Sequence, residues 1–444
     1  MATYSYTTLG TVRQELANRL YDPTQTFWSP AELNLYITEA LRTWNALTAF
    51  WRGDFTFPAV AGQTWYDITT LTNTLRSLNV LDTNLYTIIQ YHLLEAVAWN
   101  PWTGVSLQFT ADDVLNAVAR QRDETLSITG CTITERLIPA VAGRIQLPDM
   151  VIDVRRMAYV PSTLFPTQSA STMWPEDTWA EQAFNSGYTT APAGTPFAYL
   201  LSAQPPISFD TDVPPAYAGN YDLLTIEAGG TLTVGTPSTI PIPDDWTHVV
   251  KWGALANLLN KESNAKDIPR AQYCESRYRL GLAALSAAPA LLAMRVNNVP
   301  IQIDSVRGAD TYNTGWQGAA PGAPQTILHA GLNKLALAPI ADGGAYTLTA
   351  TVVENAPIPV LDADFVQVPR DILDVMLDYA QHIAAWKQGG EEFNRTMPLF
   401  QRFLKVAAMY NSKLRELGEY QTIMADLSQR EKDLAPLMDS EVTE

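Results

Sequence analysis

The sequence predicts an α+β protein, mainly helical, made of two helical-bundle modules that each carry a small antiparallel β subdomain and are arranged as a nested duplication. Two observations carry this prediction. The word PAVAG stands at 58–62 and again at 139–143, an offset of 81 (139 − 58), and the match extends without a gap into the segment before it. Two similar segments, 240–263 and 365–390, lie in the C-terminal half.

A capped helix precedes each PAVAG. Ser29 is a good N-cap, Pro30 suits the first helical position, and Glu32 stands where a capping box needs it. Thr110 and Asp113 occupy the equivalent positions at the same offset. Because Pro fixes one backbone dihedral angle and Gly allows a left-handed one, PAVAG predicts a turn that leads from this helix into a strand. An apolar face at helical spacing follows the first cap and consists of Leu33, Ile37, Ala40, Leu41, Trp44 and Leu47.

The C-terminal half repeats a helical hairpin. The segments 240–263 and 365–390 align at an offset of 126 (387 − 261), which matches Lys261 with Lys387. A second helix is predicted after each of them. Such hairpins need a neighbour to cover their apolar faces, so we expect them to pack against the capped helices.

A strand-rich segment precedes each hairpin. Both segments contain a Gly-x-Pro word, which begins at Gly194 in the first and at Gly322 in the second. In the first segment, Gly229 and Gly230 stand between alternating apolar residues, a pattern that predicts a β-hairpin.

The order of these units places one whole module inside the other. The outer module must therefore bring its first and last pieces together, because an insertion is tolerated where the ends of the interrupted loop stay close. The expected divisions are 1–82 (outer helical hairpin and strand), 83–290 (inserted inner module, with helices at 83–127, a β-rich part at 128–240 and a helical hairpin at 241–288), 291–418 (outer β-rich segment and helical hairpin) and 419–444 (acidic tail).

Composition limits the classes of protein that fit. The chain has 444 residues, 47% hydrophobic and 17% charged, which favours a globular protein of more than one domain. Two cysteines, Cys131 and Cys274, exclude a disulfide scaffold. The start MATYSYTTLG lacks the pattern of a signal peptide, and no run of 18 apolar residues predicts a membrane helix, so we expect no membrane partner.

The net charge of −17 leaves two interpretations open. A protein that neutralises nucleic-acid phosphates would carry the opposite sign. The charge is typical of a soluble, self-repelling surface. It also suits a wall that DNA passes without sticking, because like charges repel.

No motif of catalysis or cofactor binding is present, so we predict no enzyme activity, no catalytic residue, no cofactor and no metal site. The scattered histidines are interpreted as solvated or singly hydrogen-bonded residues; they are His92, His248, His329 and His382. Paired carboxylates could form catalytic dyads, but the first two pairs stand at predicted helix N-termini, where carboxylates cap. The pairs are Asp112-Asp113, Asp244-Asp245 and Glu391-Glu392.

Aromatic residues gather in the segment WPEDTWAEQAF at 174–184, which contains Trp174, Trp179 and Phe184. Such a cluster could bind sugars or bases. A cover for the sheet, or a contact between subunits, is the commoner role.

The last residues form a charged segment with a small apolar group, Leu434, Leu437 and Met438. Pro436 is expected to stop a helix there. The segment fits either a frayed, solvated tail or a segment that orders on a partner with the apolar group as its anchor.

The order of these parts resembles the head-to-tail adaptor (connector) family of tailed bacteriophages. The resemblance covers nearly the whole chain, as two modules, and the chain is about twice the usual module. The resembling features are the helix SPAELNLYITEALRTW, the word Leu147-Pro148-Asp149, the Gly-x-Pro at 194–196 and an Ile-Pro entry into C-terminal helices.

The resemblance implies a structural virion protein at the neck, assembled in the host cytoplasm. Such adaptors form a ring below the portal, usually of twelve copies, extend the DNA channel and join capsid to tail. Partners would be further copies of itself, the portal and tail or nozzle proteins, with DNA passing through the lumen. Six double-length copies could imitate twelve positions.

By the same resemblance, the C-terminal segment 419–444 would dock on the portal through Leu434, Leu437 and Met438. Two alternatives remain. A tail-associated protein could bind carbohydrate or a receptor through Trp174 and Trp179. A virion glycan hydrolase would need two carboxyl groups about 5–9.5 Å apart in a cleft.

Overall fold

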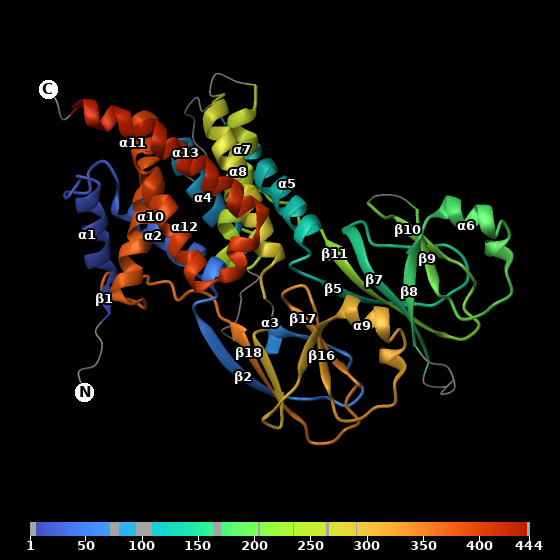
Figure 1. Ribbon diagram of the computed structural model, residues 1–444. Coiled ribbons are helices and arrows are strands. Elements are labelled where there is room, and N and C mark those ends of the chain that lie inside the picture. The colour runs from blue at the N-terminus through green and yellow to red at the C-terminus, as the bar shows by residue number, and fades with distance from the viewer. Residues whose placement is uncertain are drawn as a thin grey trace.

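The chain folds as an α+β protein, as the sequence predicts. The computed structural model describes residues 6–71, 80–94, 109–162, 170–202, 205–233, 235–262, 266–289 and 291–441 (Figure 1). Longer helices gather at one end of the molecule, and two β regions lie at the other.

The first helices of the chain share a helical core with the helices beyond position 370, which is the packing that a nested arrangement requires. Helix α2 packs against α10 and α12, and α1 packs against α10. The longer helices are α1 Leu9–Arg19, α2 Pro30–Thr48, α4 Asp82–Leu93, α5 Ala111–Thr129, α7 Thr247–Asn260, α8 Ile268–Ser286, α10 Arg370–Ala385, α12 Met397–Tyr410 and α13 Gly418–Glu441. The short helices are α3 Ile68–Leu71, α6 Thr178–Phe184, α9 Val306–Tyr312 and α11 Gly390–Arg395, with 3-10 turns η1 Tyr188–Thr190, η2 Asp244–Trp246, η3 Trp316–Gly318 and η4 Ser412–Glu416.

The predicted caps of α2 and α5 are present. The Ser29 hydroxyl accepts a hydrogen bond from the backbone N–H of Glu32 at 3.3 Å. In α5, Thr110 and Asp113 form the full capping box, with both bonds at 3.1 Å. Glu32 differs, because its carboxylate accepts hydrogen bonds from Tyr36 and from Lys387, which follows α10, instead.

The first β region is a curled sheet of seven strands in the order β5-β11-β7-β8-β9-β10-β6. All seven strands come from the segment between α5 and α7. Apolar side chains that include Met157, Phe209 and Tyr221 fill its inner face. The strands are β5 Thr134–Pro139, β6 Ile145–Gln146, β7 Val151–Pro161, β8 Ser171–Glu176, β9 Ala198–Leu201, β10 Ser208–Thr211 and β11 Gly219–Glu227.

The second β region has two four-stranded sheets, β14-β13-β18-β2 and β15-β16-β17-β3. Strands β2 and β3 flank the first PAVAG, yet they pair with β18 and β17 from the far end of the chain. The strands are β2 Arg52–Pro58, β3 Trp65–Asp67, β13 Ala293–Val296, β14 Val299–Pro300, β15 Gln302–Ser305, β16 Thr326–Ala330, β17 Lys334–Ala338 and β18 Thr347–Val353. Two short pairs complete the strands: β1 Thr7–Thr8 with β19 Phe365–Val366, and β4 Val80–Leu81 with β12 Thr239–Ile240.

The β regions are mixed and not antiparallel throughout, which corrects the sequence prediction. Strands β8 and β9 pair in parallel, as do β15 and β16. In both cases a short helix, α6 or α9, connects the two strands. A parallel pair needs such a crossover, and a two-residue turn cannot supply it.

The expected hairpin at Gly229 and Gly230 is absent from the described residues. Strand β11 ends at Glu227 and pairs on its two sides with β5 and β7. The glycines instead lie over the buried guanidinium of Arg122, which donates to the carbonyl of Gly230 at 2.6 Å. Close approach of the Arg122 guanidinium explains Gly229, whereas a Cβ at Gly230 would meet no atom within 4 Å.

The C-terminal segment is a helix, α13, that continues through Pro436 to Glu441. The expectation that Pro436 ends the helix is therefore wrong. A proline inside a helix removes one backbone hydrogen bond and crowds the carbonyl four residues before it, which can kink a helix without ending it.

Replacing Gly229 with Ala should lower the free energy of unfolding by about 1–3 kcal/mol. The new Cβ would stand 2.5 Å from Nη1 of Arg122, a side chain held by Asp123 and by the backbone. Gly230→Ala is the matched control, because no atom lies within 4 Å of a Cβ there. Urea denaturation of both variants measures the difference, and equal stabilities would contradict the role assigned to Gly229.

Candidate functional site

A buried ion pair lies at the centre of the helical part. The Nζ of Lys251, in α7, donates to both carboxylate oxygens of Glu39, in α2, at 2.6 Å. Lys251 is 1% exposed and Glu39 5%. Burial lowers the pKa of Lys251 to about 8, and the attraction of Glu39 opposes that shift. The pair joins a helix from the first piece of the chain to a helix of the inner segment.

Arg277, in α8, extends this cluster with a second buried cation. Its guanidinium donates to the hydroxyl of Tyr273 at 2.7 Å and to that of Tyr379 in α10. It also lies over the ring of Phe400, 4.1 Å from the ring centroid. The Tyr379 hydroxyl donates to Glu39 at 3.3 Å, so that both cations are connected to the same carboxylate.

Two buried histidines, His382 and His92, complete the cluster. His382 contacts the Tyr273 hydroxyl at 2.6 Å and the Thr396 hydroxyl at 2.8 Å. His92 contacts the Ile88 carbonyl at 2.8 Å and lies 3.5 Å from Nζ of Lys251. Burial holds the pKa of both histidines well below the ordinary 6.5. They are therefore neutral side chains with two polar neighbours each, and the expectation of solvated or singly bonded histidines is wrong for them.

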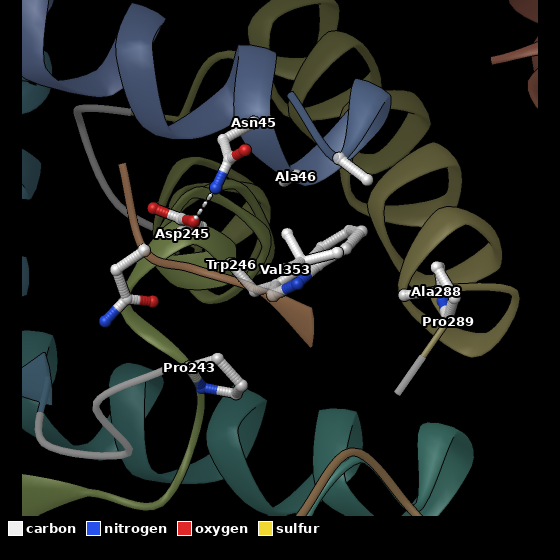
Figure 2. A pocket seen from close by; sticks show the side chains of 10 residues that line it. Asn45, Ala46, Pro243, Asp245, Trp246, Ala288, Pro289 and Val353 are labelled. Carbon is white, nitrogen blue, oxygen red and sulfur yellow. Dashed lines mark hydrogen bonds between the residues drawn. The ribbon is translucent and has the colours of Figure 1, made fainter. Parts of the chain in front are cut away.

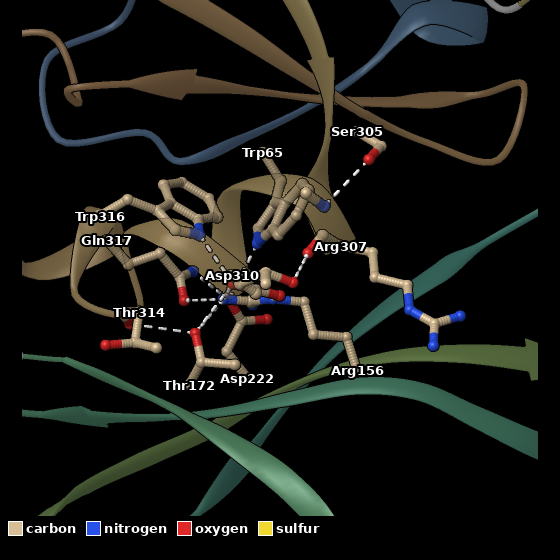
Figure 3. A network of polar contacts seen from close by, with 12 residues as sticks. Trp65, Arg156, Thr172, Asp222, Ser305, Arg307, Asp310, Thr314, Trp316 and Gln317 are labelled. Carbon is tan, nitrogen blue, oxygen red and sulfur yellow. Dashed lines mark hydrogen bonds and ion pairs between the residues drawn. The ribbon is translucent and has the colours of Figure 1, made fainter.

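A second buried polar cluster joins the two β regions (Figure 3). Arg156, in β7, forms a two-pronged ion pair with Asp310, in α9, at 2.7 and 3.1 Å. Both side chains are about as buried as Glu39. The Nε1 of Trp316 and the hydroxyl of Thr172 each donate to Asp310 at 2.8 Å. Gln317 accepts from Arg156 at 2.8 Å.

The same cluster reaches a second carboxylate. Asp222, in β11, accepts from Gln317 at 2.7 Å and from Nε1 of Trp65, in β3, at 2.8 Å. Arg156 and Asp222 of the seven-stranded sheet thus bind residues of the second β region through Asp310, Gln317 and Trp65. These hydrogen bonds and the ion pair hold two parts of the chain together.

At least one member of each carboxylate pair has a structural partner. Asp113 caps α5 and also pairs with Lys261 at 2.6 Å. Asp245 lies in the first turn of η2, but its carboxylate makes no cap there and accepts from Asn45 at 2.6 Å (Figure 2). The cavity beside it, of about 10 Å³, has room for about one water molecule. Glu391 and Glu392 stand in the first turn of α11.

A larger cavity of about 160 Å³ lies against the buried ion pair and is lined in part by Arg42, His248 and Lys251. It is below the roughly 300 Å³ of ordinary ligand pockets. His248 is buried, with Nδ1 at 3.0 Å from the Asp245 carbonyl. His329 is partly buried in β16, and burial lowers its pKa as well.

The aromatic segment does not cover the sheet. Helix α6 has no buried residue, and Trp179 and Phe184 are 81% and 92% exposed. Trp174, in β8, is 43% exposed. The segment is a free surface at the end of the inner β region (Figure 1).

The C-terminal helix α13 packs over α8 and α12 with its first half. Tyr420, Ile423 and Leu427 are buried there. An open groove of about 810 Å³ lies between α13 and α8. The side chains of the predicted docking residues lie outside the described residues; these are Leu434, Leu437 and Met438.

No group of three or more His, Cys, Asp or Glu side chains in the described ranges is placed to hold a metal ion. Within the same ranges, no helix is both long and apolar enough to cross a membrane. No protein-family model matches the chain, and no curated protein matches it.

Sequence reasoning missed the residues of both buried clusters. A signal was present for Lys251, because it is the only charged residue in the helical run VVKWGALANLL, whereas Glu39 stands near Arg42 and two threonines in ITEALRTW and is not marked in this way. A charge on an apolar face indicates a buried partner. No comparable signal marks Arg156 or Asp310, because the pairing depends on how two distant β regions meet.

Lys251→Met should lower the free energy of unfolding by about 3–5 kcal/mol, because it leaves the Glu39 carboxylate buried without its cation. The double variant Glu39→Gln/Lys251→Met should recover part of that loss, since neither charge is then buried alone. Urea denaturation of the two single variants and the double variant forms a double-mutant cycle. Additive losses would contradict a coupled pair.

Stability should fall in acid partly because of His248. Burial lowers its pKa from the ordinary 6.5 to about 3, with repulsion from Arg277 and Lys251 adding to the shift. Between pH 6.5 and 3 the unfolded chain therefore binds a proton that the folded chain does not, so stability falls as pH falls. The variant His248→Gln should lose about 2 kcal/mol less than the parent between pH 7 and pH 5. Urea midpoints at the two pH values measure this, and parallel losses would exclude His248 as a source.

Proposed function

We propose that this chain is a structural virion protein, a head-to-tail adaptor that forms a ring below the portal of a tailed bacteriophage. It is built from two mainly helical modules, 83–290 and the outer pieces 1–82 with 291–418, related by a nested duplication. The observation that carries the proposal is the module anatomy itself: one order of helices, strands and crossover occurs twice, and one copy interrupts the other.

Equivalent backbone geometry at an offset of 81 supports the duplication. Helices α2 and α5 both have 19 residues. Each ends at a left-handed residue, Ala49 with φ 51° and Gly130 with φ 57°. The final glycines of the two PAVAG turns, Gly62 and Gly143, have φ values of 74° and 89°.

Two equivalent ion pairs support it further. Glu32 and Asp113 stand at the third position of α2 and α5, and each pairs with a lysine that follows a C-terminal helix. The partners are Lys387, at 2.9 Å from Glu32, and Lys261, at 2.6 Å from Asp113. The two acidic residues are related by the offset of 81 and the two lysines by the offset of 126. Each ion pair therefore joins one residue from each of the two repeats found in the sequence.

The strand order supports it across the β regions. The inner order β5-β11-β7-β8-β9-β10-β6 corresponds to β2-β18-β13 followed by β15-β16-β17-β3 in the outer region. The parallel pair and its crossover helix recur at the same place. After that helix, Asn185 and Asn313 have φ values of −139° and −145°, and Gly187 and Gly315 both have −100°. Both pairs of positions share an offset of 128 (313 − 185).

An adaptor ring accounts for features that an enzyme would leave unexplained. The buried polar groups hold the two modules to each other, and the pocket beside the ion pair is small. The net charge of −17 suits a lumen through which DNA slides. Twelve copies are the number that the family resemblance implies, and six double-length copies would give the same number of module positions.

A second candidate function rests on the exposure of α6. Trp174 and Trp179 present aromatic surface to solvent, which sugar-binding proteins use. A tail-associated protein that binds carbohydrate or a receptor would be expected to retain glycans on an array in its isolated form. Glycan retention by the parent, lost in Trp179→Ala, would favour this candidate over the adaptor.

Removing residues 430–444 should abolish binding to portal rings without unfolding the protein. The packed half of α13, with Tyr420, Ile423 and Leu427, stays in place in this truncation. Co-sedimentation with purified portal rings and negative-stain images measure binding. Full binding by the truncated chain would refute the docking assignment.

In the full-length chain, a triple change of Leu434, Leu437 and Met438 to Asp should have the same effect, with Ser440→Ala as the control. A parent protein that forms no ring with portal under any condition would refute the adaptor role itself.

A further inference from the structure

The contact between the two modules of one chain is head-to-tail. The outer module contributes α9 and η3, with Asp310, Trp316 and Gln317. The inner module contributes the outward face of its sheet, with Arg156 on β7 and Asp222 on β11. The two similar modules therefore contribute different surfaces to the contact between them. Such a heterologous contact leaves one unused copy of each surface in the chain.

The unused helix surface is on α6. The offset of 128 relates α6 to α9. In α9, Ala309 and Asp310 are 2% and 4% exposed, and Asp310 pairs with Arg156 of the inner sheet. Their equivalents, Glu181 and Gln182, are half-buried and exposed. Helix α6 thus presents to solvent the side that its counterpart buries.

The unused sheet surface is on β13 and β18. Strand registers fix the correspondence. Asp222 pairs across the inner sheet with Ala158, and Thr349 pairs across the outer sheet with Arg295. On its other side, Asp222 pairs with Leu137, and Thr349 pairs with Thr56. Leu137 and Thr56 are related by the offset of 81, so Thr349 is the equivalent of Asp222 and Arg295 that of Ala158. Arg295 is exposed and Thr349 half-exposed, whereas Ala158 is fully buried in the contact within the chain.

We propose that α6 of one copy docks on the β13–β18 face of a second copy, repeating between chains the contact that α9 makes within one. This inference rests on the proposed duplication and names the ring interface of the proposed adaptor. Inner and outer modules then alternate around the ring, and every copy fills two successive positions. Closure by rotation gives a ring, as heterologous contacts do.

Charge complementarity marks the contact. Within the chain, two small buried residues flank the Arg156–Asp310 pair: Ala158, two positions along the same face of β7, and Ala309, the neighbour of Asp310. Their equivalents between copies are Arg295 and Glu181. Between copies, Arg295 on β13 and Glu181 on α6 would thus form an ion pair next to the positions equivalent to Arg156 and Asp310. The cation again comes from the strand and the carboxylate from the helix.

The exposed aromatic residues of α6 lie outside this contact. The equivalents of Trp179 and Phe184 are Arg307 and Tyr312. Both stay exposed beside the docked α9, and Arg307 points away from the cluster in Figure 3.

Charge reversal with complementation tests the interface. Glu181→Arg places two cations in the contact, and Arg295→Glu places two carboxylates there. Like charges across an interface are costly, so each variant alone should assemble at least ~10-fold more weakly than the parent. An equimolar mixture should form rings again, because every contact in an alternating ring then joins opposite charges. The double variant Glu181→Arg/Arg295→Glu should assemble alone for the same reason.

Mass photometry and negative-stain images, with portal rings present where they are needed for assembly, measure ring formation. Thermal melting checks that each variant folds. Lys413→Glu is the matched control, a charge reversal at an exposed position of the helical part. Parent-like rings from each single variant, or no rescue in the mixture, would overturn the interface and leave the adaptor role standing. A parent without rings in any condition would instead refute the adaptor role.

Discussion

The arrangement of the whole chain depends on charges that are buried where the two proposed modules meet. Lys251 and Glu39 are removed from water in the helical part, and Arg156 and Asp310 between the β regions. A charge taken out of water is costly unless its partner is held in good geometry. Each pair takes one member from each module, so separation of the modules would expose or orphan both pairs. Two such contacts at opposite ends of the boundary fix the angle between the modules.

A fixed angle is what the proposed ring subunit would need. A closed ring adds the same rotation at every step, and a loose joint within the subunit would let the steps differ. The nested path of the chain adds to this constraint. Strands β2 and β3 complete sheets whose other strands all come from the chain after Leu292, so this β region forms only when two distant segments of the chain meet. The path of the chain and the buried ion pairs therefore both keep these parts of the protein in one relative placement.

Local signals made much of this fold predictable. The caps at Ser29 and Thr110, the helices after them and the two offsets depend on interactions between residues a few positions apart. The sheets were predicted less well. The two glycines predicted a turn because the sequence does not show that Arg122 needs the space at Gly229. A parallel pair depends on where a crossover helix leads the chain. The buried clusters join residues as distant in sequence as Glu39 and Tyr379, and only unusual charges such as Lys251 hinted at them.

Buried ion pairs also suit the proposed build of this chain from two similar modules. The danger for such a chain is that equivalent elements exchange places while it folds. The equivalents of Glu39 and Lys251 are Arg120 and Leu377, and those of Arg156 and Asp310 are Ala293 and Gln182. An exchange would therefore bury a charge without its partner, at a cost of about 3–5 kcal/mol for each broken pair. Apolar contacts between similar helices would discriminate far less, because one aliphatic side chain replaces another at small cost. The polar clusters thus specify which copy of each element belongs to which module.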